Sequence, residues 1–341
     1  MAASSETHGR DLEVEIVLGS YEQILFGYSL SLSTDSANLS LSFTDKSHCA
    51  SVRALAASHR KLLASGSADE TIQLFDLKSR QEAGTLMRHN ATITHLEFYK
   101  EFLISSDENG VICVWKIIGK TYECLKALSG HKGSVTSFSV HPSGKLLLSV
   151  GHDKTIRTWN LVTGKRAYTT STPSVIDIVK WSPDGERYVF LYGSKLDVCL
   201  LSKAAPVHSI KLPGKGHTLT FLSDKILAAG CETGVVSFIN IDTATIVHEI
   251  VLDANRIKCV SSKLIENLES LLALVTNDGR VELHLSKIDG DDVVTTSLIS
   301  ACKTLLRPIC MELIVTSDEP MKSDMVSLID WYVHRLLLLS S

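Results

Sequence analysis

Apolar and polar positions alternate in short runs along most of this chain, and one block of that pattern recurs. Its clearest copies are LLASGSADETIQLFDL at residues 62–77 and LLLSVGHDKTIRTWNL at 146–161, and a weaker copy, FLISSDENGVICVWKI, lies at 102–117. Each copy has an apolar run, a turn of small residues with Asp or Asn, and an alternating run that ends in an aromatic residue. Alternation with a period of two is typical of strands, and the turn residues favour a tight hairpin. Each copy therefore predicts two antiparallel strands.

The spacing of the block is regular along the chain. The apolar residue three positions before the terminal aromatic aligns all the copies, four degraded ones included: Ile24, Ile72, Ile112, Ile156, Leu196, Val235 and Val281. Successive members of this series lie 39 to 48 residues apart. A period of roughly 40–45 residues with a Trp-Asp-like ending is typical of the four-stranded blades of propellers. The seven members predict an all-β fold, a seven-bladed WD-repeat β-propeller.

The ends of the chain differ from the repeats. Residues 1–13 are polar and charged, and we expect them to form a disordered tail. The propeller is expected to span residues 14–315, and residues 316–341 form a divergent C-terminal segment that fits no repeat. The N-terminal blade begins with its second strand, so its inner strand has to come from elsewhere. Residues 307–315 are apolar and strand-like, and closing the ring with them would remove two exposed sheet edges.

Turn signals mark the degraded blades. The segments HPSGK at 141–145 and SPDGE at 182–186 lie 41 residues apart. Both combine Pro, which presets a turn dihedral, with Gly, which accepts a positive φ. The position of the terminal aromatic is occupied in blades four, five and six by Cys199, Phe238 and His284.

Composition and charge narrow the class of protein. The net charge is −4 and hydrophobic residues make up 44% of the chain, which is ample for a shared core. We expect no membrane partner, because the N-terminus lacks the apolar region of a secretory signal and no apolar run is long enough to span a bilayer. The eight cysteines are scattered singly, and we interpret them as reduced core residues.

A Ser, a His and an Asp recur at fixed offsets in the repeats. In blade three these residues are His131, Ser149 and Asp153, with Trp159 following. The same arrangement occurs in blade one and in blade two as His48, Ser65, Asp69 and Phe75, and as His89, Ser105, Asn109 and Trp115. A catalytic triad uses the same residue types, but a nucleophile site does not occur three times in register. We therefore interpret them as structural hydrogen-bond networks. In each network the turn residue accepts a hydrogen bond from His, the His hydrogen-bonds the Ser hydroxyl, and where Trp is present that hydroxyl also hydrogen-bonds the Trp N–H.

The other candidate sites are weak. No two of the thirteen histidines form HxH or HExxH, and the glycine-rich segments 130–134 and 214–217 do not match phosphate-binding loops. We therefore expect no catalytic, cofactor or metal site, no cofactor and no small-molecule substrate. Basic residues concentrate in blades two and three: Lys100, Lys116, Lys120, Lys126, Lys132, Lys145, Lys154, Arg157, Lys165 and Arg166. They form either a basic rim that faces RNA or an acidic protein, or an ordinary solvated surface.

Beyond the general repeat, four segments carry a closer resemblance. They are GSYEQILFGYSL at 19–30, SADETIQLFDL at 67–77, the segment 141–168 and VKWSPDGERYV at 179–189. In these segments the chain resembles the p21-activated-kinase-interacting family of WD-repeat proteins. The element YEQ-L-FG is distinctive, because generic WD repeats do not carry it. The resemblance covers nearly all of residues 14–315.

The resemblance implies a non-enzymatic protein-interaction scaffold. The fungal counterpart is a ribosome-biogenesis protein, which implies assembly of the large ribosomal subunit in the nucleus and nucleolus. The implied partners are pre-ribosomal proteins, with pre-rRNA as a further one, and in animals a p21-activated kinase that the protein binds and restrains. Members commonly end in a Lys-rich tail, which serves nuclear import, whereas this chain ends in DWYVHRLLLLSS at 330–341. Without such a tail a cytoplasmic location is the alternative.

Two alternatives for function stay open at this point. One is a WD-repeat signalling adaptor, and the other is a substrate receptor of a ubiquitin ligase. Such receptors often carry Trp-Asp-x-Arg after the third strand, whereas the corresponding tetrapeptides here are FDLK, WKII and WNLV, starting at Phe75, Trp115 and Trp159. The missing Arg disfavours the receptor.

Overall fold

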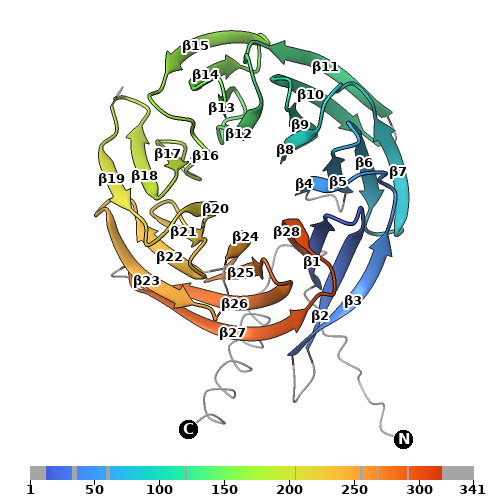
Figure 1. The fold of residues 1–341 in the computed structure, drawn as a ribbon, viewed down its shortest axis with the longest axis vertical. Coiled ribbons are helices and arrows are strands. Elements are labelled where there is room, and N and C mark those ends of the chain that lie inside the picture. The colour runs from blue at the N-terminus through green and yellow to red at the C-terminus, as the bar shows by residue number, and fades with distance from the viewer. Residues whose placement is uncertain are drawn as a thin grey trace, which may run out of the picture.

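The computed structural model describes residues 13–32, 37–58, 62–119, 121–203, 205–253, 256–266, 269–289 and 292–316. Within these ranges the chain forms seven four-stranded antiparallel sheets, arranged radially around a central axis (Figure 1). The predicted all-β, seven-bladed propeller is thereby confirmed. The expected tail and the divergent C-terminal segment fall almost wholly outside the described residues; only Glu13 and Thr316 are described, and both belong to strands.

The strands follow one another blade by blade. The N-terminal blade contains β1 (Glu13–Ser20), β2 (Leu25–Leu32), β3 (Ala37–Asp45) and the last strand, β28 (Pro308–Thr316). Blades one and two are β4 (Val52–Ala57), β5 (Leu62–Ser67), β6 (Ile72–Asp76), β7 (Gln81–Leu86), and β8 (Ile93–Tyr99), β9 (Phe102–Asp107), β10 (Val111–Ile118), β11 (Thr121–Ser129). Blades three and four are β12 (Val135–Val140), β13 (Leu146–Gly151), β14 (Thr155–Asn160), β15 (Lys165–Ser171), and β16 (Ile178–Trp181), β17 (Arg187–Tyr192), β18 (Lys195–Leu200), β19 (His208–Lys211). Blades five and six are β20 (Gly216–Phe221), β21 (Ile226–Cys231), β22 (Val235–Asn240), β23 (Thr245–Val251), and β24 (Ile257–Glu266), β25 (Glu269–Thr276), β26 (Arg280–Ile288), β27 (Val294–Lys303).

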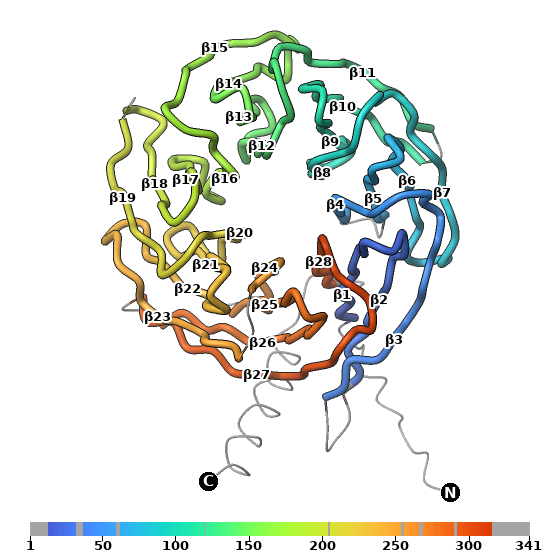
Figure 2. Tube along the Cα trace, in the orientation of Figure 1, coloured from blue at the N-terminus to red at the C-terminus, as the bar shows by residue number. Residues whose placement is uncertain are grey.

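The ring is closed by strands from both ends of the described chain. The sheet order is β28-β1-β2-β3, and β28 pairs with β1 antiparallel, with Ile16 opposite Leu313 and Leu18 opposite Met311. Figure 2 shows the red C-terminal strand on the inner side of the blue N-terminal ones. Ile16 and Leu313 are fully buried, so the closing pair is also part of the core. The inner strand expected at residues 307–315 is confirmed.

The antiparallel order of each blade gives the ring two distinct faces. The turns between the second and third strands, such as 152–154, lie on the same face as the links that enter the next inner strand, such as 130–134. We call this face the upper face. The opposite, lower face carries the turns between first and second strands, such as 141–145, and between third and fourth strands, such as 161–164.

The core lies between neighbouring blades, because each sheet buries both of its faces against the sheets beside it. Ile72 and Leu74 of blade one pack with Ile93 and Leu103 of blade two, and all four side chains are fully buried. Burying a Leu or Ile side chain contributes about 1.5–3 kcal/mol. Gly66 is required at this junction, since a Cβ there would lie 2.4 Å from Ile93.

The expectations on cysteines and membrane spans can be compared with the structure. All eight cysteines lie in the described residues and are free, and most of them are buried or partly buried, but Cys49 is exposed on the upper face and does not belong to the core. In the part of the chain that the structure describes, no helix has the length and apolar character needed to cross a bilayer.

Candidate functional site

The upper face of blade three is braced by a buried polar network. The Trp159 Nε1–H donates to the Ser149 Oγ over 2.9 Å, and that oxygen lies 2.7 Å from the His131 Nε2. The His131 Nδ1 lies 3.0 Å from the Asp153 carboxylate. Because the indole can only donate and the carboxylate can only accept, the Ser149 hydroxyl donates to Nε2 and the His131 Nδ1–H donates to Asp153.

Asp153 connects this network to the loops of the upper face. Its carboxylate accepts the backbone N–H of Lys132 at 3.0 Å and the Thr155 hydroxyl at 2.8 Å. Burial would raise the pKa of Asp153, but the hydrogen bonds from Lys132, His131 and Thr155 outweigh it and lower the pKa to about 2. Burial also lowers the pKa of His131, although Asp153 acts against that fall. Asp153 therefore stays ionised and ties the link 130–134 to the turn 152–154.

Blade one repeats the arrangement with a shorter network. The His48 Nδ1 lies 2.9 Å from the Asp69 carboxylate, and its Nε2 lies 2.9 Å from the Ser65 Oγ. Phe75 takes the place of the indole and stacks on Phe43 at a ring-centroid distance of 5.2 Å. The network therefore has no indole donor: the Ser65 hydroxyl donates to the Gln73 backbone oxygen at 3.5 Å, and an aromatic stack takes the place of the indole hydrogen bond.

Blade two corrects one assignment made from the sequence. The prediction placed Asn109 in contact with His89, but the His89 Nδ1 pairs with Asp107 at 2.6 Å, and Nε2 lies 2.7 Å from the Ser105 Oγ. The Trp115 Nε1–H completes the network by donating to Ser105 at 2.8 Å. Asn109 instead donates to a backbone oxygen of the preceding link, that of Asn90, at 3.1 Å.

The physical reason for this difference lies at the end of β9. Asp107 is two residues beyond Ser105, at the position that is Gly151 in blade three and Ser67 in blade one. A carboxylate at this position lies within hydrogen-bond distance of the histidine, and it is a stronger acceptor for the imidazole N–H than the Asn109 amide. The sequence already contained this information, because blade two is the only one of the three copies with a carboxylate two residues after the network serine.

The three networks position loops and are closed to substrates. Ser149 and Ser105 are 0% exposed, and their hydroxyls are engaged on both sides by His and Trp. A nucleophilic serine has to reach a substrate carbon with its oxygen, which these buried hydroxyls cannot do. Their geometry is that of fixed braces between two upper-face loops in each blade.

Blades four and six have other polar contacts near the upper face. In blade four Asp177 accepts the backbone N–H of Gly193 at 3.1 Å, which again joins the entering link to the turn. In blade six Glu282 lies 2.5 Å from Arg280 and 2.8 Å from His284. Burial would raise the pKa of Glu282, but His284 and Arg280 outweigh it and hold the pKa below its usual value.

Each face carries exposed apolar side chains. On the upper face these include Met87 before β8, Tyr21 between β1 and β2, and Leu305 before β28. The backbone N–H of Tyr21 donates to the Arg307 oxygen at 3.0 Å, so the two loops of the N-terminal blade are held together. On the lower face Val162 between β14 and β15 is as exposed as Met87, with 75% of its surface accessible in each case.

The basic residues of blades two and three do not form one rim. Lys132 and Lys154 lie in upper-face loops, whereas Lys100 and Lys145 lie in lower-face turns. Arg157 is buried, and its Nη2 lies 3.4 Å from Asp153. Lys120 lies outside the described residues. The distribution favours the solvated-surface interpretation over a continuous basic rim.

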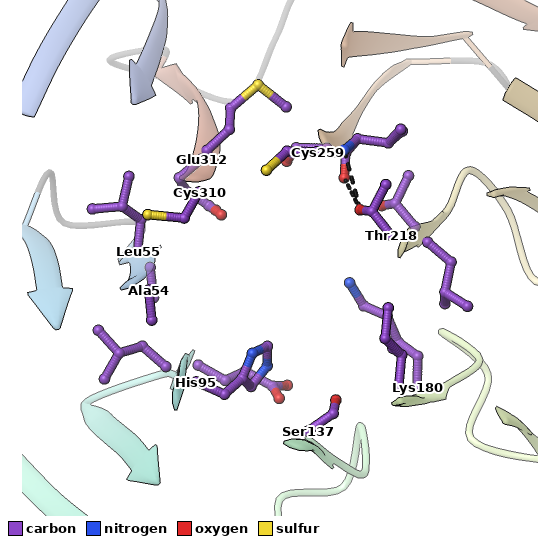
Figure 3. Close-up of a pocket in the computed structure, with 18 of the residues that line it drawn as sticks. Ala54, Leu55, His95, Ser137, Lys180, Thr218, Cys259, Cys310 and Glu312 are labelled. Atoms are coloured by element: carbon purple, nitrogen blue, oxygen red, sulfur yellow. Dashed lines mark hydrogen bonds between the residues drawn. The ribbon is translucent and has the colours of Figure 1, made fainter. Parts of the chain in front are cut away.

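The inner strands enclose a central channel of about 550 Å³ (Figure 3). Lys180 points into it, and Glu97 and Glu312 lie at equivalent positions of β8 and β28. The Lys263 ammonium of β24 lies 3.3 Å from Glu312. Burial raises the pKa of Glu97 to about 7 against the opposing effect of Lys180, and burial lowers the pKa of Lys180 itself. Within the described residues no group of three His, Cys, Asp or Glu side chains is placed to hold a metal ion.

Comparisons with known proteins agree with this architecture. The family model "WD domain, G-beta repeat" matches residues 39–76 and 122–160, which include all but the last residue of each clear copy of the repeat. A solved structure titled "Structure of U3-55K" aligns with a TM-score of 0.63 and 14% identity over 74% of this chain and 82% of that one. At this identity the likeness shows the fold alone.

Sequence relatives decide the family. The zebrafish (Danio rerio) "p21-activated protein kinase-interacting protein 1-like" is 38% identical over 299 residues, which cover 87% of this chain and 80% of the relative. The chain belongs to this family. More distant relatives of the p21-activated protein kinase-interacting protein are fungal. "Protein MAK11" of Saccharomyces cerevisiae is 31% identical over 197 residues, 51% of this chain and 45% of that protein. "Shk1 kinase-binding protein 15" of Schizosaccharomyces pombe is 27% identical over 273 residues, 79% of this chain and 76% of that protein.

Membership confirms the resemblance inferred from the sequence. The protein is a WD-repeat member of the p21-activated protein kinase-interacting family and a relative of MAK11. Its propeller belongs to a class of folds that generally present binding loops on a rigid scaffold. The braced upper face and the channel are the candidate sites of interaction.

Proposed function

We propose that the protein is a non-enzymatic scaffold that acts in the nucleolus in assembly of the large ribosomal subunit. Its partners would be pre-ribosomal proteins, with pre-rRNA as a further contact. The observation that carries the proposal is the upper face, on which His, Ser and Asp networks hold entering links and turns of successive blades in fixed positions. The family relationship, which includes MAK11, supports the choice of process.

The mechanism would be the presentation of many loops on one rigid surface. Asp69 and Asp153 each accept the backbone N–H that follows the network histidine, that of Cys49 and that of Lys132, both at 3.0 Å. A loop that is already ordered loses little conformational entropy when a partner binds, so more of the contact energy appears as affinity. The apolar side chains of Met87, Tyr21 and Leu305 would supply contact area between the polar loops.

The test is co-sedimentation with large-subunit precursors, made with two matched variants. Met87→Glu places a charge on the upper face, and Val162→Glu places the same charge on the lower face at a position with the same 75% exposure. We expect the wild type and Val162→Glu to sediment with the precursors and Met87→Glu to be depleted from them. A wild-type chain that is absent from those fractions, in cells with normal precursor processing, would contradict the proposal.

A second proposed function is restraint of a p21-activated kinase. The names of the zebrafish relative and of the fission-yeast relative both record binding to a kinase. The protein would occupy the regulatory region of the kinase with the same loop-bearing face. A pull-down with the kinase regulatory segment tests this function separately from the ribosomal one. Absence of binding at micromolar concentrations would rule it out and leave the assembly role untouched.

A further inference from the structure

Three cations gather at the upper mouth of the channel. Arg53 is the second residue of β4, Lys258 is the second residue of β24, and Lys215 directly precedes β20. All three line the channel, and none of them forms an ion pair with a carboxylate among the residues that the structure describes. Arg53 belongs to blade one, Lys215 to blade five and Lys258 to blade six, so the mouth brings together cations that are far apart in the sequence.

A histidine with a free nitrogen lies within this cluster. The His217 Nε2 is buried, has no hydrogen-bond partner in the described structure, and lies 3.7 Å from Glu232, at ion-pair rather than hydrogen-bond distance. Burial lowers the pKa of His217, and Arg256, Lys215 and Lys258 lower it further. The imidazole is therefore neutral at pH 7, and both cations and the Glu232 carboxylate lie near it. Glu232 also lies 3.8 Å from Arg256, so it offsets that cation and leaves the other two uncompensated.

The N-terminal blade lies between the cations of blades six and one. Burial raises the pKa of the Cys310 thiol on β28, and Lys258 and Arg53 both act against that rise. The two cations therefore lie on either side of the same thiol, one from each neighbouring blade. The cations of the mouth therefore come from blades five, six and one, whereas the N-terminal blade, which lies between blades six and one, contributes none.

The charge changes along the channel axis. Glu97 lies three residues further along its inner strand than the mouth position Thr94, a distance of about 10 Å at the rise of a strand. At this depth Glu312 pairs with Lys263 at 3.3 Å, and Glu97, whose pKa burial raises to about 7, interacts with Lys180. The cations without a carboxylate partner therefore lie at the mouth and not deeper in the channel.

We propose that the upper mouth of the channel binds a compact polyphosphorylated anion of the inositol polyphosphate class. Arg53, Lys215 and Lys258 would contact the phosphate groups. The channel that opens at this mouth has a volume of about 550 Å³, which lies in the size range of small-molecule sites. An extended polyanion such as RNA is disfavoured, because the opposite side of the mouth carries the Asp177 carboxylate and no continuous basic track. This inference does not depend on the proposed function.

The test is calorimetric titration of the whole protein with inositol hexakisphosphate at constant ionic strength. We expect saturable binding of one ligand per chain. Lys258→Gln and Lys215→Gln should each weaken the affinity roughly tenfold, the effect of losing one charge-assisted hydrogen bond. Lys132→Gln is the matched control, since it removes the same charge from the same face outside the mouth. It should bind almost as well as the wild type.

The variants also separate a built site from general attraction. Equal losses in Lys132→Gln and Lys258→Gln, or no saturable binding by the wild type, would overturn the proposal. Melting temperatures without ligand check folding. If Lys258→Gln is less stable than the wild type, Lys215→Gln carries the test, because Lys215 lies in an exposed link.

A second arm distinguishes a free ligand from a lipid headgroup. Phosphatidylcholine vesicles with and without phosphatidylinositol bisphosphate are compared with the soluble probe. Binding of the soluble probe without binding to vesicles supports a free anion, and binding of both with loss in Lys258→Gln supports headgroup recognition at the same mouth. Binding to vesicles alone would overturn the recessed site, because the ligand would then be the membrane surface.

Discussion

Ser149→Ala is the perturbation that tests most sharply how the upper face is braced. The substitution removes one hydroxyl and leaves the Trp159 Nε1–H and the His131 Nε2 without the partner that lies 2.9 Å and 2.7 Å away. Both residues are buried, so water does not replace the lost hydrogen bonds. A buried polar group left unsatisfied costs about 1–3 kcal/mol, and two such groups give a loss of about 3 kcal/mol in the free energy of unfolding.

Blade one provides the matched comparison. Phe75 occupies the position of the indole there, so Ser65→Ala removes only the 2.9 Å partner of the His48 Nε2, which also lies 3.2 Å from the Ser65 backbone oxygen. The expected loss is about 1.5 kcal/mol, half of that in blade three. Both variants remove the same atom from equivalent strands, so the difference reports the Trp hydrogen bond together with the backbone partner that His48 keeps.

The assay is urea unfolding followed by circular dichroism, with a double-mutant cycle in blade three. Ser149→Ala, Trp159→Phe and the double variant are compared under the same conditions, so that the volume lost with the indole cancels. We expect a coupling energy of about 1–2 kcal/mol between the two sites. If Ser149→Ala costs no more than Ser65→Ala and the two changes in blade three are additive, the Trp–Ser hydrogen bond does not brace the loops.

Three further predictions address other parts of the ring. Gly110→Ala should destabilise the protein by about 2 kcal/mol more than Gly119→Ala in thermal unfolding. Both glycines have a positive φ, but a Cβ at Gly110 would lie 2.7 Å from a carbonyl oxygen of the next blade, whereas a Cβ at Gly119 would have nothing within 4 Å. Leu313→Ala, in the closing strand, should lower the free energy of unfolding by about 3 kcal/mol, whereas the exposed Leu305→Ala should leave it unchanged; equal effects would contradict the closing role of β28. Glu97→Gln should raise the melting temperature above pH 7 and give no gain below pH 4.5. The pKa of Glu97 is raised from 4.5 in the unfolded chain to about 7 in the folded protein, so between these pH values the folded protein binds more protons. The stability of the wild type therefore falls as pH rises through this window, and the Gln variant avoids that loss. A wild-type melting temperature that is constant across this window would contradict the raised pKa.

The ring itself could be predicted from the sequence, because the signals that specify it are local. The block around Ile156 predicts two strands and the turn between them, and the regular recurrence of that block along the chain predicts the number of blades. Even the degraded blade with Cys199 in place of the aromatic keeps its register, since Leu196 is fully buried at the expected position. The closing strand was visible as the one strand-like segment without a blade of its own.

The site could be predicted only in part, because its charges meet only when the ring closes. Glu97, Lys180 and Glu312 each look like an ordinary charge in an alternating strand, and the sequence gives no sign that they face one channel. Asp107 was missed for a different reason. The prediction applied the Ser-to-Asp spacing of blade three to blade two, which points to Asn109, but the His89 imidazole pairs with the nearer Asp107 carboxylate. Offsets within a blade can be read locally, but competition between neighbouring side chains cannot.

Lysine cross-linking of the protein bound to purified large-subunit precursors tests the central claim most directly. Lys132 and Lys154 lie in upper-face loops, and Lys100 and Lys145 lie in lower-face turns of the same two blades. If the braced upper face is the contact surface, cross-links to ribosomal components will come from Lys132 and Lys154. Cross-links that come mainly from Lys100 and Lys145 would contradict the account.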